Sequence, residues 1–308
     1  MIKKECFTAE WIEQVSSELH YNDKNLIEKV IRALSLLEML VKAGCPLVFK
    51  GGTALMLILG KSAHRLSIDI DLICPPGTNI EDYLKSFADF GFINLELVER
   101  KQRDDADIPK SHSKFFYQIA YRNDTDAQSY ILLDVLYEDI HYFRTQQIAI
   151  NCPFIRLEGK PLMVTVPSAE DILGDKLTAF APNTTGIPYY RNGRSCSMEI
   201  AKQLYDVGRL FENVSDLQIT KEAFRKIAVV ELSYRSFGTD IGQVFNDIRQ
   251  TALCISTRGK AGEGDFDLIQ DGIIRVKSFM YKQRYLIDHA IIDAARAAYL
   301  ATLIEKGI

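Results

Sequence analysis

A pair of carboxylates separated by one residue, Asp69 and Asp71, lies in the segment LSIDIDLIC at 66–74. Polar and apolar residues alternate here, which predicts a β-strand. Residues i and i+2 of a strand point to the same side, so both carboxylates should share one face with Ser67. Two like charges this close repel each other unless one is protonated or a cation lies between them. Hard oxygen ligands on a rigid element suit Mg²⁺ or Mn²⁺, so the pair predicts a divalent metal site, with an ordinary solvated strand face as the alternative.

Two glycines precede the carboxylate pair. Gly51 and Gly52 lie between the apolar run PLVFK at 46–50, which predicts a strand, and the run TALMLILG at 53–60, which predicts a short helix. Glycines at such a junction allow backbone N–H groups to approach an anion, and the N-terminus of the helix adds a favourable field. We therefore predict a phosphate-binding turn, with an ordinary tight turn as the alternative.

A third carboxylate, Asp134, interrupts the otherwise apolar segment SYILLDVLYE at 129–138. The apolar residues predict a strand, and a carboxylate within one is costly unless it is paired or binds a metal. Asp134 is therefore a candidate third ligand for the metal that Asp69 and Asp71 would hold. The alternative is a position at the end of the sheet, where water solvates the carboxylate.

Together, the glycine pair, the Asp pair and the third Asp resemble the active site of the polymerase β-type nucleotidyltransferase superfamily. More narrowly, FKGGTALMLILGKSAHRLSIDIDLIC at 49–74 resembles the first motif of the AbiEii/AbiGii toxin family, in which Lys-Gly-Gly-Thr-x-Leu is followed by Arg-x-Ser-x-Asp-x-Asp. Farther along, EDILGDKLTAF at 170–180 is similar to the lysine-bearing helix of that family, and EIAKQLYDVGRL at 199–210 to its Asp-containing helix. The resemblance covers roughly residues 45–210.

The resemblance implies a role for each residue that matches these motifs. The nucleotide would be bound by Lys50, Gly51, Gly52, Thr53, Arg65, Ser67 and Lys176. The metal would be bound by Asp69, Asp71 and Asp134. The catalytic set would be Asp69, Asp71, Asp134, Lys176 and Asp206. Without the resemblance, Lys176 would be interpreted as a solvated helix lysine, and Asp206 as the i,i+4 partner of Lys202.

The resemblance also implies a reaction and its partners. An acceptor hydroxyl would attack the α-phosphorus of a nucleoside triphosphate (NTP) and pyrophosphate would leave, with Mg²⁺ or Mn²⁺ stabilising the attacking and leaving oxygens. The chain would be the toxin of a toxin–antitoxin or phage-abortive-infection system. Its acceptor would be RNA, of a tRNA-like kind, and its companion would be a cognate antitoxin. Independently of the resemblance, Ser67 shares the face of the Asp pair, so a phosphate on it would repel the nucleotide; it is a candidate site of modification, with an ordinary small strand residue as the alternative.

Two other functions are compatible with part of this pattern. A phosphatase of the haloacid dehalogenase type also uses Asp-x-Asp, but it needs Thr or Val where this chain has Ile73, and it gives the glycine pair no role. A non-catalytic nucleotide-binding protein on the same scaffold would not need to keep three carboxylates. The chain has no GxSxG, P-loop or GxGxxG motif and no histidine spacing typical of zinc sites, which argues against those classes of enzyme.

The remaining patterns predict the elements that position these residues. Helices are expected at 24–43 and 80–90, and most of the chain after the candidate N-cap Ser168 should also be helical. Further strands are expected at 92–100 and 114–122, and shorter ones that complete the sheet at 146–150, 154–158 and 162–166. The polar segment 100–113 is a candidate mobile loop. We predict an α+β fold with a polymerase β-like mixed sheet and flanking helices in residues 1–167, followed by a helical domain in residues 168–308 that completes the active-site cleft.

Composition limits the class of protein. The 308 residues are 47% hydrophobic and carry a net charge of −4, so this is a folded chain in which any nucleic acid must meet a local basic patch. Arg191 and Arg194 adjoin two tyrosines in the loop 186–195 and form one candidate patch. Six scattered cysteines, no recognisable signal peptide and no apolar run long enough to cross a bilayer predict a reduced, cytoplasmic protein that does not enter a membrane.

Overall fold

The main sheet of the computed structural model has five strands and brings the predicted strand segments together. The structure describes residues 1–97, 110–121, 127–234 and 240–308. The strands are β1 (Val48–Lys50), β2 (Ile70–Cys74), β3 (Asn94–Leu97), β4 (Lys110–Gln118) and β5 (Gln128–Tyr137). Their order is β1-β2-β5-β4-β3, with β2 and β5 parallel and the other neighbours antiparallel. The predicted mixed sheet is therefore confirmed.

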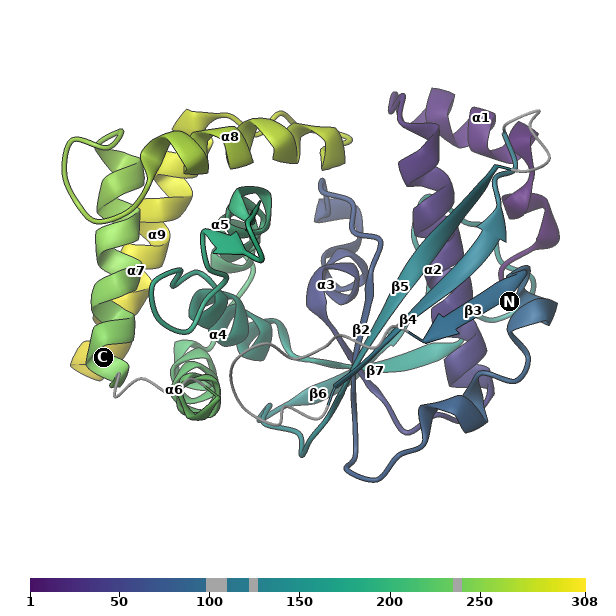
Figure 1. Cartoon of the computed structure of the whole chain (residues 1–308), viewed down its shortest axis with the longest axis horizontal. Coiled ribbons are helices and arrows are strands. Elements are labelled where there is room, and N and C mark those ends of the chain that lie inside the picture. Colours follow the sequence, from purple (N-terminus) through teal and green to yellow (C-terminus); the bar gives the residue numbers. More distant parts are fainter. Residues whose placement is uncertain (98–109, 122–126, 235–239) are drawn as a thin grey trace.

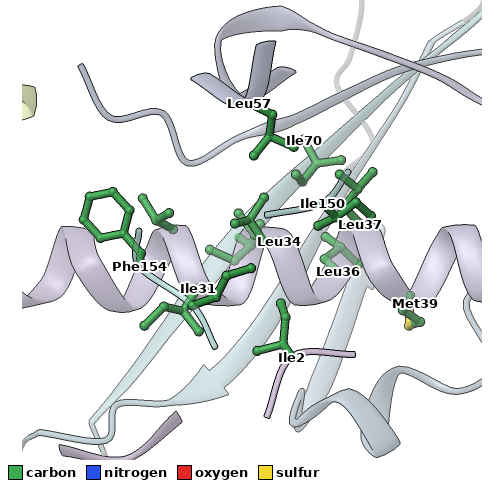
Figure 2. Packing of buried hydrophobic residues seen from close by; sticks show 14 of the residues in the cluster. Ile2, Ile31, Leu34, Leu36, Leu37, Met39, Leu57, Ile70, Ile150 and Phe154 are labelled. Carbon is green, nitrogen blue, oxygen red and sulfur yellow. The ribbon is translucent and has the colours of Figure 1, made fainter. Parts of the chain in front are cut away.

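The helices of the N-terminal half enclose the larger hydrophobic core with this sheet. They are η1 (Lys4–Phe7), α1 (Ala9–Glu18), α2 (Lys24–Lys42), α3 (Gly51–Leu59) and η2 (Gly60–Ser62). The long α2 occupies the predicted range 24–43 almost completely and supplies much of the core. Figure 2 shows Ile31, Leu34 and Leu37 of α2 among the buried side chains, together with Ile70 of β2.

The C-terminal half is helical, as predicted, and has its own core. Its helices are α4 (Ala169–Ala179), α5 (Ser197–Phe211), α6 (Leu217–Ser233), α7 (Ile241–Ser256), α8 (Phe266–Val276), η5 (Lys277–Phe279) and α9 (Ile287–Lys306). Figure 1 shows these helices on one side of α3 and the strands β3–β5 on the other. The division at residue 167 stays a prediction, because Leu55 of α3 belongs to the second core and Tyr281 belongs to the first. Within the described ranges, no helix combines the length and apolar character needed to span a membrane.

Two short segments differ from the prediction. Residues 80–90 form two 3₁₀ helices, η3 (Ile80–Tyr83) and η4 (Phe87–Phe90), instead of one α-helix. Tight i→i+3 turns suit a connection that buries single side chains rather than a continuous helix face. Residues 154–158 make one isolated bridge and no strand. The adjacent Phe154 and Ile155 are both buried, which the alternation of a half-exposed strand does not allow.

The last predicted strands and the loops also differ in part. β6 (Thr145–Ala149) and β7 (Met163–Pro167) pair with each other and do not complete the main sheet. The neighbouring edge strand β1 is only three residues long, so it offers little ladder for them to extend. The loop 186–195 contains a small hairpin, β8 (Tyr190–Arg191) and β9 (Arg194–Ser195). Most of the candidate mobile loop 100–113 lies outside the described residues, and its last four residues begin β4.

The predicted strand at 66–74 forms a ladder only from Ile70 onward, so Asp69 lies just before β2. The predicted alternation holds in part, because Ile68 is only partly buried and Ile73, two residues after Asp71, is buried. Leu66, Ile70 and Leu72 are fully buried in the core or nearly so, whereas Ser67, Asp69 and Asp71 are only partly buried. The prediction that the polar side chains share one face is therefore confirmed.

Residues 279–281, from the C-terminal half, form backbone hydrogen bonds with the segment that precedes β2. The Leu66 N–H donates to the Phe279 carbonyl at 2.8 Å, and the Tyr281 N–H donates to the His64 carbonyl at 3.1 Å. These bonds flank Arg65, which forms an isolated β-bridge with this stretch. The stretch takes the place of a neighbouring strand and fixes the direction in which the Arg65 side chain leaves the backbone.

Candidate active site

Four polar side chains form a row across the centre of the main sheet. Lys50 of β1 is paired with Asp71 of β2, Asp71 with Asp134 of β5, and Asp134 with His112 of β4. Directly paired residues on neighbouring strands share a face, so the four side chains lie on one surface. Asp69, two residues before Asp71, faces the same way. The fold thus brings the predicted Asp pair next to the predicted third carboxylate.

The N-terminus of α3 adjoins this row at Asp71. Gly51 has a φ of +77°, and a Cβ built on it would lie 2.0 Å from Oδ2 of Asp71. A Cβ on Gly52 would lie 2.7 Å from Oγ of Ser67 and 3.0 Å from Nη2 of Arg65. Both glycines therefore permit a close approach that any other residue would block. No side chain caps the helix at its preceding residue, which leaves the first backbone N–H groups for an anion.

Replacing Gly51 with alanine should destabilise the protein by more than about 1 kcal/mol and remove NTP binding. The positive φ disfavours alanine, and the new methyl group would collide with the Asp71 carboxylate. Thermal unfolding and calorimetric titration with an NTP would measure the two effects. Gly77, with a φ of +83° and nothing within 4 Å of a built Cβ, is the matched control. Gly77→Ala should share the backbone strain but keep NTP binding, and equal NTP affinity in both variants would contradict the close approach.

Thr53 lies in the first turn of α3 but does not present its hydroxyl to the predicted phosphate site. Its side chain is fully buried, and Oγ1 donates to the carbonyl oxygen of Asp69 at 2.7 Å. This bond ties α3 to the segment that carries the carboxylate pair. Thr53 therefore positions Asp69 relative to the helix N-terminus, which is a different role from direct phosphate contact.

A buried ion cluster joins the two halves of the protein beside Gly52. Arg65 donates to both carboxylate oxygens of Asp206, with Nη2 at 2.8 Å from each, and Nζ of Lys176 lies 2.9 Å from Oδ2. All three residues are at most 8% exposed. Burial alone would raise the pKa of Asp206, but the two cations outweigh it and lower that pKa. The anticipated i,i+4 partner, Lys202, instead lies over the ring of Phe279 with its Nζ 3.9 Å from the centroid.

The carboxylates of the row repel one another. Burial, reinforced by Asp69 and Asp134, raises the pKa of Asp71 to about 7. Burial raises the pKa of Asp69 as well; Lys202 opposes this, and Asp134 adds to it. A divalent cation between the carboxylates would relieve the repulsion, and hard oxygen donors are the ligands that Mg²⁺ and Mn²⁺ prefer. The donor chemistry therefore fits the predicted metal.

The positions of the carboxylates do not by themselves define a metal site. In the ranges that the structure describes, no three His, Cys, Asp or Glu side chains are gathered closely enough to hold an ion. Oδ1 of Asp134 lies 2.5 Å from Nδ1 of His112, which draws this carboxylate toward β4. The assignment of Asp69, Asp71 and Asp134 as metal ligands stays a prediction.

Lys50 places a permanent cation at the other end of the row. Its Nζ lies 3.6 Å from Oδ2 of Asp175, and the hydroxyl of Tyr142 donates to the same oxygen at 2.8 Å. Burial would lower the pKa of Lys50, but Asp175, Tyr142 and Asp71 outweigh it and raise that pKa. Lys50 therefore stays charged beside Asp71, on the side where α3 begins.

Sequence reasoning missed two residues of this site. His112 pairs with Asp134 only through the register of two strands, which no local pattern reveals. Lys202 was considered only as a partner of Asp206, although their i,i+4 spacing already placed it on the same helix face. Burial, followed by the charge of Arg65, lowers the pKa of Lys202 to about 8, and its charge acts on Asp69. Lys202 therefore adds a second cation from α5 near the carboxylates.

Comparison with known proteins identifies the family. The family model described as "Nucleotidyl transferase AbiEii toxin, Type IV TA system" matches residues 34–284. The chain belongs to this AbiEii family. The matched range contains the whole row across the sheet and the ion cluster, and it confirms the resemblance found in the sequence. The description of the AbiEii family is that of nucleotidyltransferase toxins of type IV toxin–antitoxin systems. No curated protein matched this chain.

Two solved structures resemble this AbiEii-family chain over most of its length. MenT4, a nucleotidyltransferase toxin from Mycobacterium tuberculosis H37Rv, is 12% identical with a TM-score of 0.51, over 96% of this chain and 89% of that one. JHP933 from Helicobacter pylori is 16% identical with a TM-score of 0.47, over 91% and 93% of the two chains. The likeness to MenT4 confirms the predicted fold class, a mixed sheet with flanking helices followed by a helical region.

Proposed function

We propose that this AbiEii-family chain is a Mg²⁺- or Mn²⁺-dependent enzyme that transfers a nucleoside monophosphate from an NTP to a hydroxyl group of RNA. Its biological role would be that of the toxin in a toxin–antitoxin or abortive-infection system, opposed by a cognate antitoxin. One observation carries the proposal: Asp71 and Asp134 are paired on neighbouring strands, with Asp69 beside them and the uncapped N-terminus of α3 against Asp71.

The two sides of the carboxylates have different chemistry. Toward β1, the N–H groups of α3 and the ammonium groups of Lys50 and Lys176 can receive the triphosphate. Lys176 donates to Asp206 and Gln203, which leaves one of its three N–H donors for a phosphate oxygen. Toward β4, Asp134 would orient the acceptor hydroxyl and accept its proton. Positioning and charge neutralisation by these groups would supply most of the acceleration.

The proposed reaction is an in-line displacement. A bond forms between the acceptor oxygen and the α-phosphorus, and the bond from that phosphorus to the oxygen bridging to the β-phosphate breaks. A divalent ion held by Asp69 and Asp71 would neutralise charge on the attacking and leaving oxygens. Arg65 holds Asp206 and thereby Lys176 in place, and its Nη2 lies beside Gly52, so its contact with the nucleotide stays a prediction.

Incubation with α-labelled NTPs, Mg²⁺ and total RNA tests the proposal. Wild-type protein should transfer label to RNA, and EDTA should stop the transfer. The variant Asp69→Ala/Asp71→Ala should transfer none, whereas Asp288→Ala, which removes an exposed carboxylate from α9, should behave like wild type. Equal transfer by the double variant would show that the site is wrong. Release of inorganic phosphate without transfer would favour the phosphatase alternative.

A further inference from the structure

An aromatic and basic surface continues from the carboxylates along β4 and β5. Tyr130 lies four residues before Asp134 on β5 and therefore on the same face. Phe116 is paired with Tyr130. Lys114 is paired with Leu132, which lies between Tyr130 and Asp134 on the same face of β5. Lys29 reaches the same ring from α2. We call Tyr130, Phe116, Lys114 and Lys29 the aromatic–basic strip.

Tyr130 is the exposed residue of the strip and the other three are partly buried, and their composition is that of a single-strand binding surface. Tyr130 is 40% exposed, and its ring centroid lies 5.7 Å from that of Phe116. Nζ of Lys29 lies 5.6 Å from the Tyr130 centroid, and Nζ of Lys114 lies 5.4 Å from it. Lys114 also forms an ion pair with Glu96 at 3.6 Å, so its charge is partly compensated. Aromatic faces between lysines can stack bases and neutralise the phosphates that join them.

The strip lies beside the reacting groups. At about 3.3 Å per residue, Tyr130 is about 13 Å along β5 from Asp134. A stacked strand rises about 3.4 Å per nucleotide, so a few nucleotides span this distance.

The geometry of the reaction decides which substrate lies here. In an in-line displacement, the attacking and leaving oxygens are on opposite sides of the phosphorus. The triphosphate would lie at the N-terminus of α3, so pyrophosphate would leave toward β1. The acceptor must then approach from the side of β5 and β4 (Figure 1), the two strands that carry Tyr130, Phe116 and Lys114.

We propose that the aromatic–basic strip binds the single-stranded segment of the RNA acceptor next to its reacting hydroxyl, with one base stacked on Tyr130 and phosphates contacting Lys29 and Lys114. This inference rests on the proposed nucleotidyltransferase function and names its acceptor subsite. A base–aromatic stack is stronger than an exposed cation–π contact, so a base can displace a lysine from the ring. The displaced ammonium then meets the phosphate beside the stacked base.

Fluorescence anisotropy with a labelled 12-nucleotide single-stranded RNA tests the strip without requiring catalysis. Tyr130→Ala should weaken binding about 5- to 150-fold, and Tyr130→Phe should bind like wild type because it keeps the ring. Lys29→Ala and Lys114→Ala should each reduce the slope of log Kd against log salt by about 0.7. Glu96→Gln should strengthen binding, because it removes a negative charge and frees Lys114.

Tyr299→Ala is the matched control. Tyr299 is 55% exposed on α9 and makes an edge contact with Phe211, so it resembles Tyr130 in setting but lies outside the strip. Its loss should leave RNA binding unchanged. Melting temperatures of both alanine variants would identify any loss of RNA binding that follows from unfolding, and Tyr130→Phe separates the ring from the hydroxyl.

Steady-state transfer assays distinguish the acceptor from the nucleotide. Tyr130→Ala should raise the KM for RNA and leave the KM for the NTP unchanged. A raised KM for the NTP alone would show that the strip holds the base of the nucleotide, which overturns the inference. Wild-type protein that fails to bind the RNA, or Tyr130→Ala that binds it like wild type, would also overturn it. RNA binding without any transfer of label would instead contradict the proposed function and leave the strip as a binding surface.

Discussion

Replacing Asp206 with alanine is expected to lower the free energy of unfolding by about 3–5 kcal/mol. Asp206 is fully enclosed and neutralises the guanidinium of Arg65 and the ammonium of Lys176. Without it, two buried cations would face each other with no counter-charge. Urea unfolding of the wild type and the variant, at one pH and salt concentration, would measure the loss.

The pH dependence of this effect has a definite sign. The pKa of Asp206 is lowered in the folded protein, so its stabilising contribution is present above 3.8, the ordinary value for aspartate, and is lost as the pH falls below it. The difference in the free energy of unfolding between wild type and Asp206→Ala should therefore shrink in that acidic range. A difference that stays constant down to pH 2 would show that packing, and not charge, accounts for the loss.

A triple variant separates charge from shape. Arg65→Met/Lys176→Met/Asp206→Leu removes the whole cluster and leaves side chains of comparable volume. Most of the lost stability should return, because well-packed apolar residues often replace a buried ion cluster at little cost. The triple variant should not transfer nucleotide, because it lacks the Lys176 ammonium that would contact the triphosphate. A triple variant as unstable as Asp206→Ala would contradict this explanation.

Replacing Asp71 with asparagine should reduce nucleotide transfer by at least about a hundredfold and, without divalent ions, raise the melting temperature. Asparagine has nearly the shape of aspartate and still fits against Gly51, but it carries no charge. Partial burial, followed by the charges of Asp69 and Asp134, raises the pKa of the wild-type carboxylate to about 7. Function and stability should therefore change in opposite directions.

The sign follows from that raised pKa. The folded protein binds the Asp71 proton more tightly than the unfolded chain, so wild-type stability in EDTA should fall as the pH rises from 3.8 to about 7. Asp71→Asn should lose part of this slope. Mg²⁺ should stabilise the wild type by about 2.7 kcal/mol at a concentration of 100 Kd, and the variant much less. Thermal melts from pH 4 to 8, with Mg²⁺ or EDTA, measure both effects.

Two results would contradict this account of Asp71. If Asp71→Asn transferred nucleotide as fast as the wild type, the carboxylate would have no role in the reaction. If the variant were inactive but melted at a lower temperature with an unchanged pH slope, Asp71 would be a structural hydrogen-bonding residue. Asp288→Asn, an exposed change on α9, should alter neither activity nor the pH slope.

Local patterns failed where burial depends on distant neighbours. The apolar residues at 154–158 suggested a strand, yet both Phe154 and Ile155 are buried by contacts from other parts of the chain. The helix expected at 80–90 became two short 3₁₀ helices for a similar reason, because the surroundings require single buried residues. By contrast, the long α2 was predicted well, because its apolar stripe repeats over 19 residues.

The sequence by itself determined the first half of the candidate site. Gly51, Gly52, Asp69 and Asp71 lie within 21 consecutive residues, and the local geometry of a strand, a turn and a helix start already brings them together. Alternation along an extended segment decides which side chains share a face, and this rule needs no knowledge of the rest of the chain. The metal and phosphate chemistry predicted for these residues rests on their types and spacing.

The tertiary structure alone decided the second half. Helical spacing favoured Lys202 as the partner of Asp206, but such a pair contributes only about 0.3–0.5 kcal/mol. Packing of the two halves instead brings Arg65, 141 residues away in the chain, to that carboxylate. A lysine or an aspartate has the same local pattern whether it is solvated or buried. Only the three-dimensional arrangement removes the water, and that removal makes the loss of the distant partner far more costly than the loss of the neighbouring one.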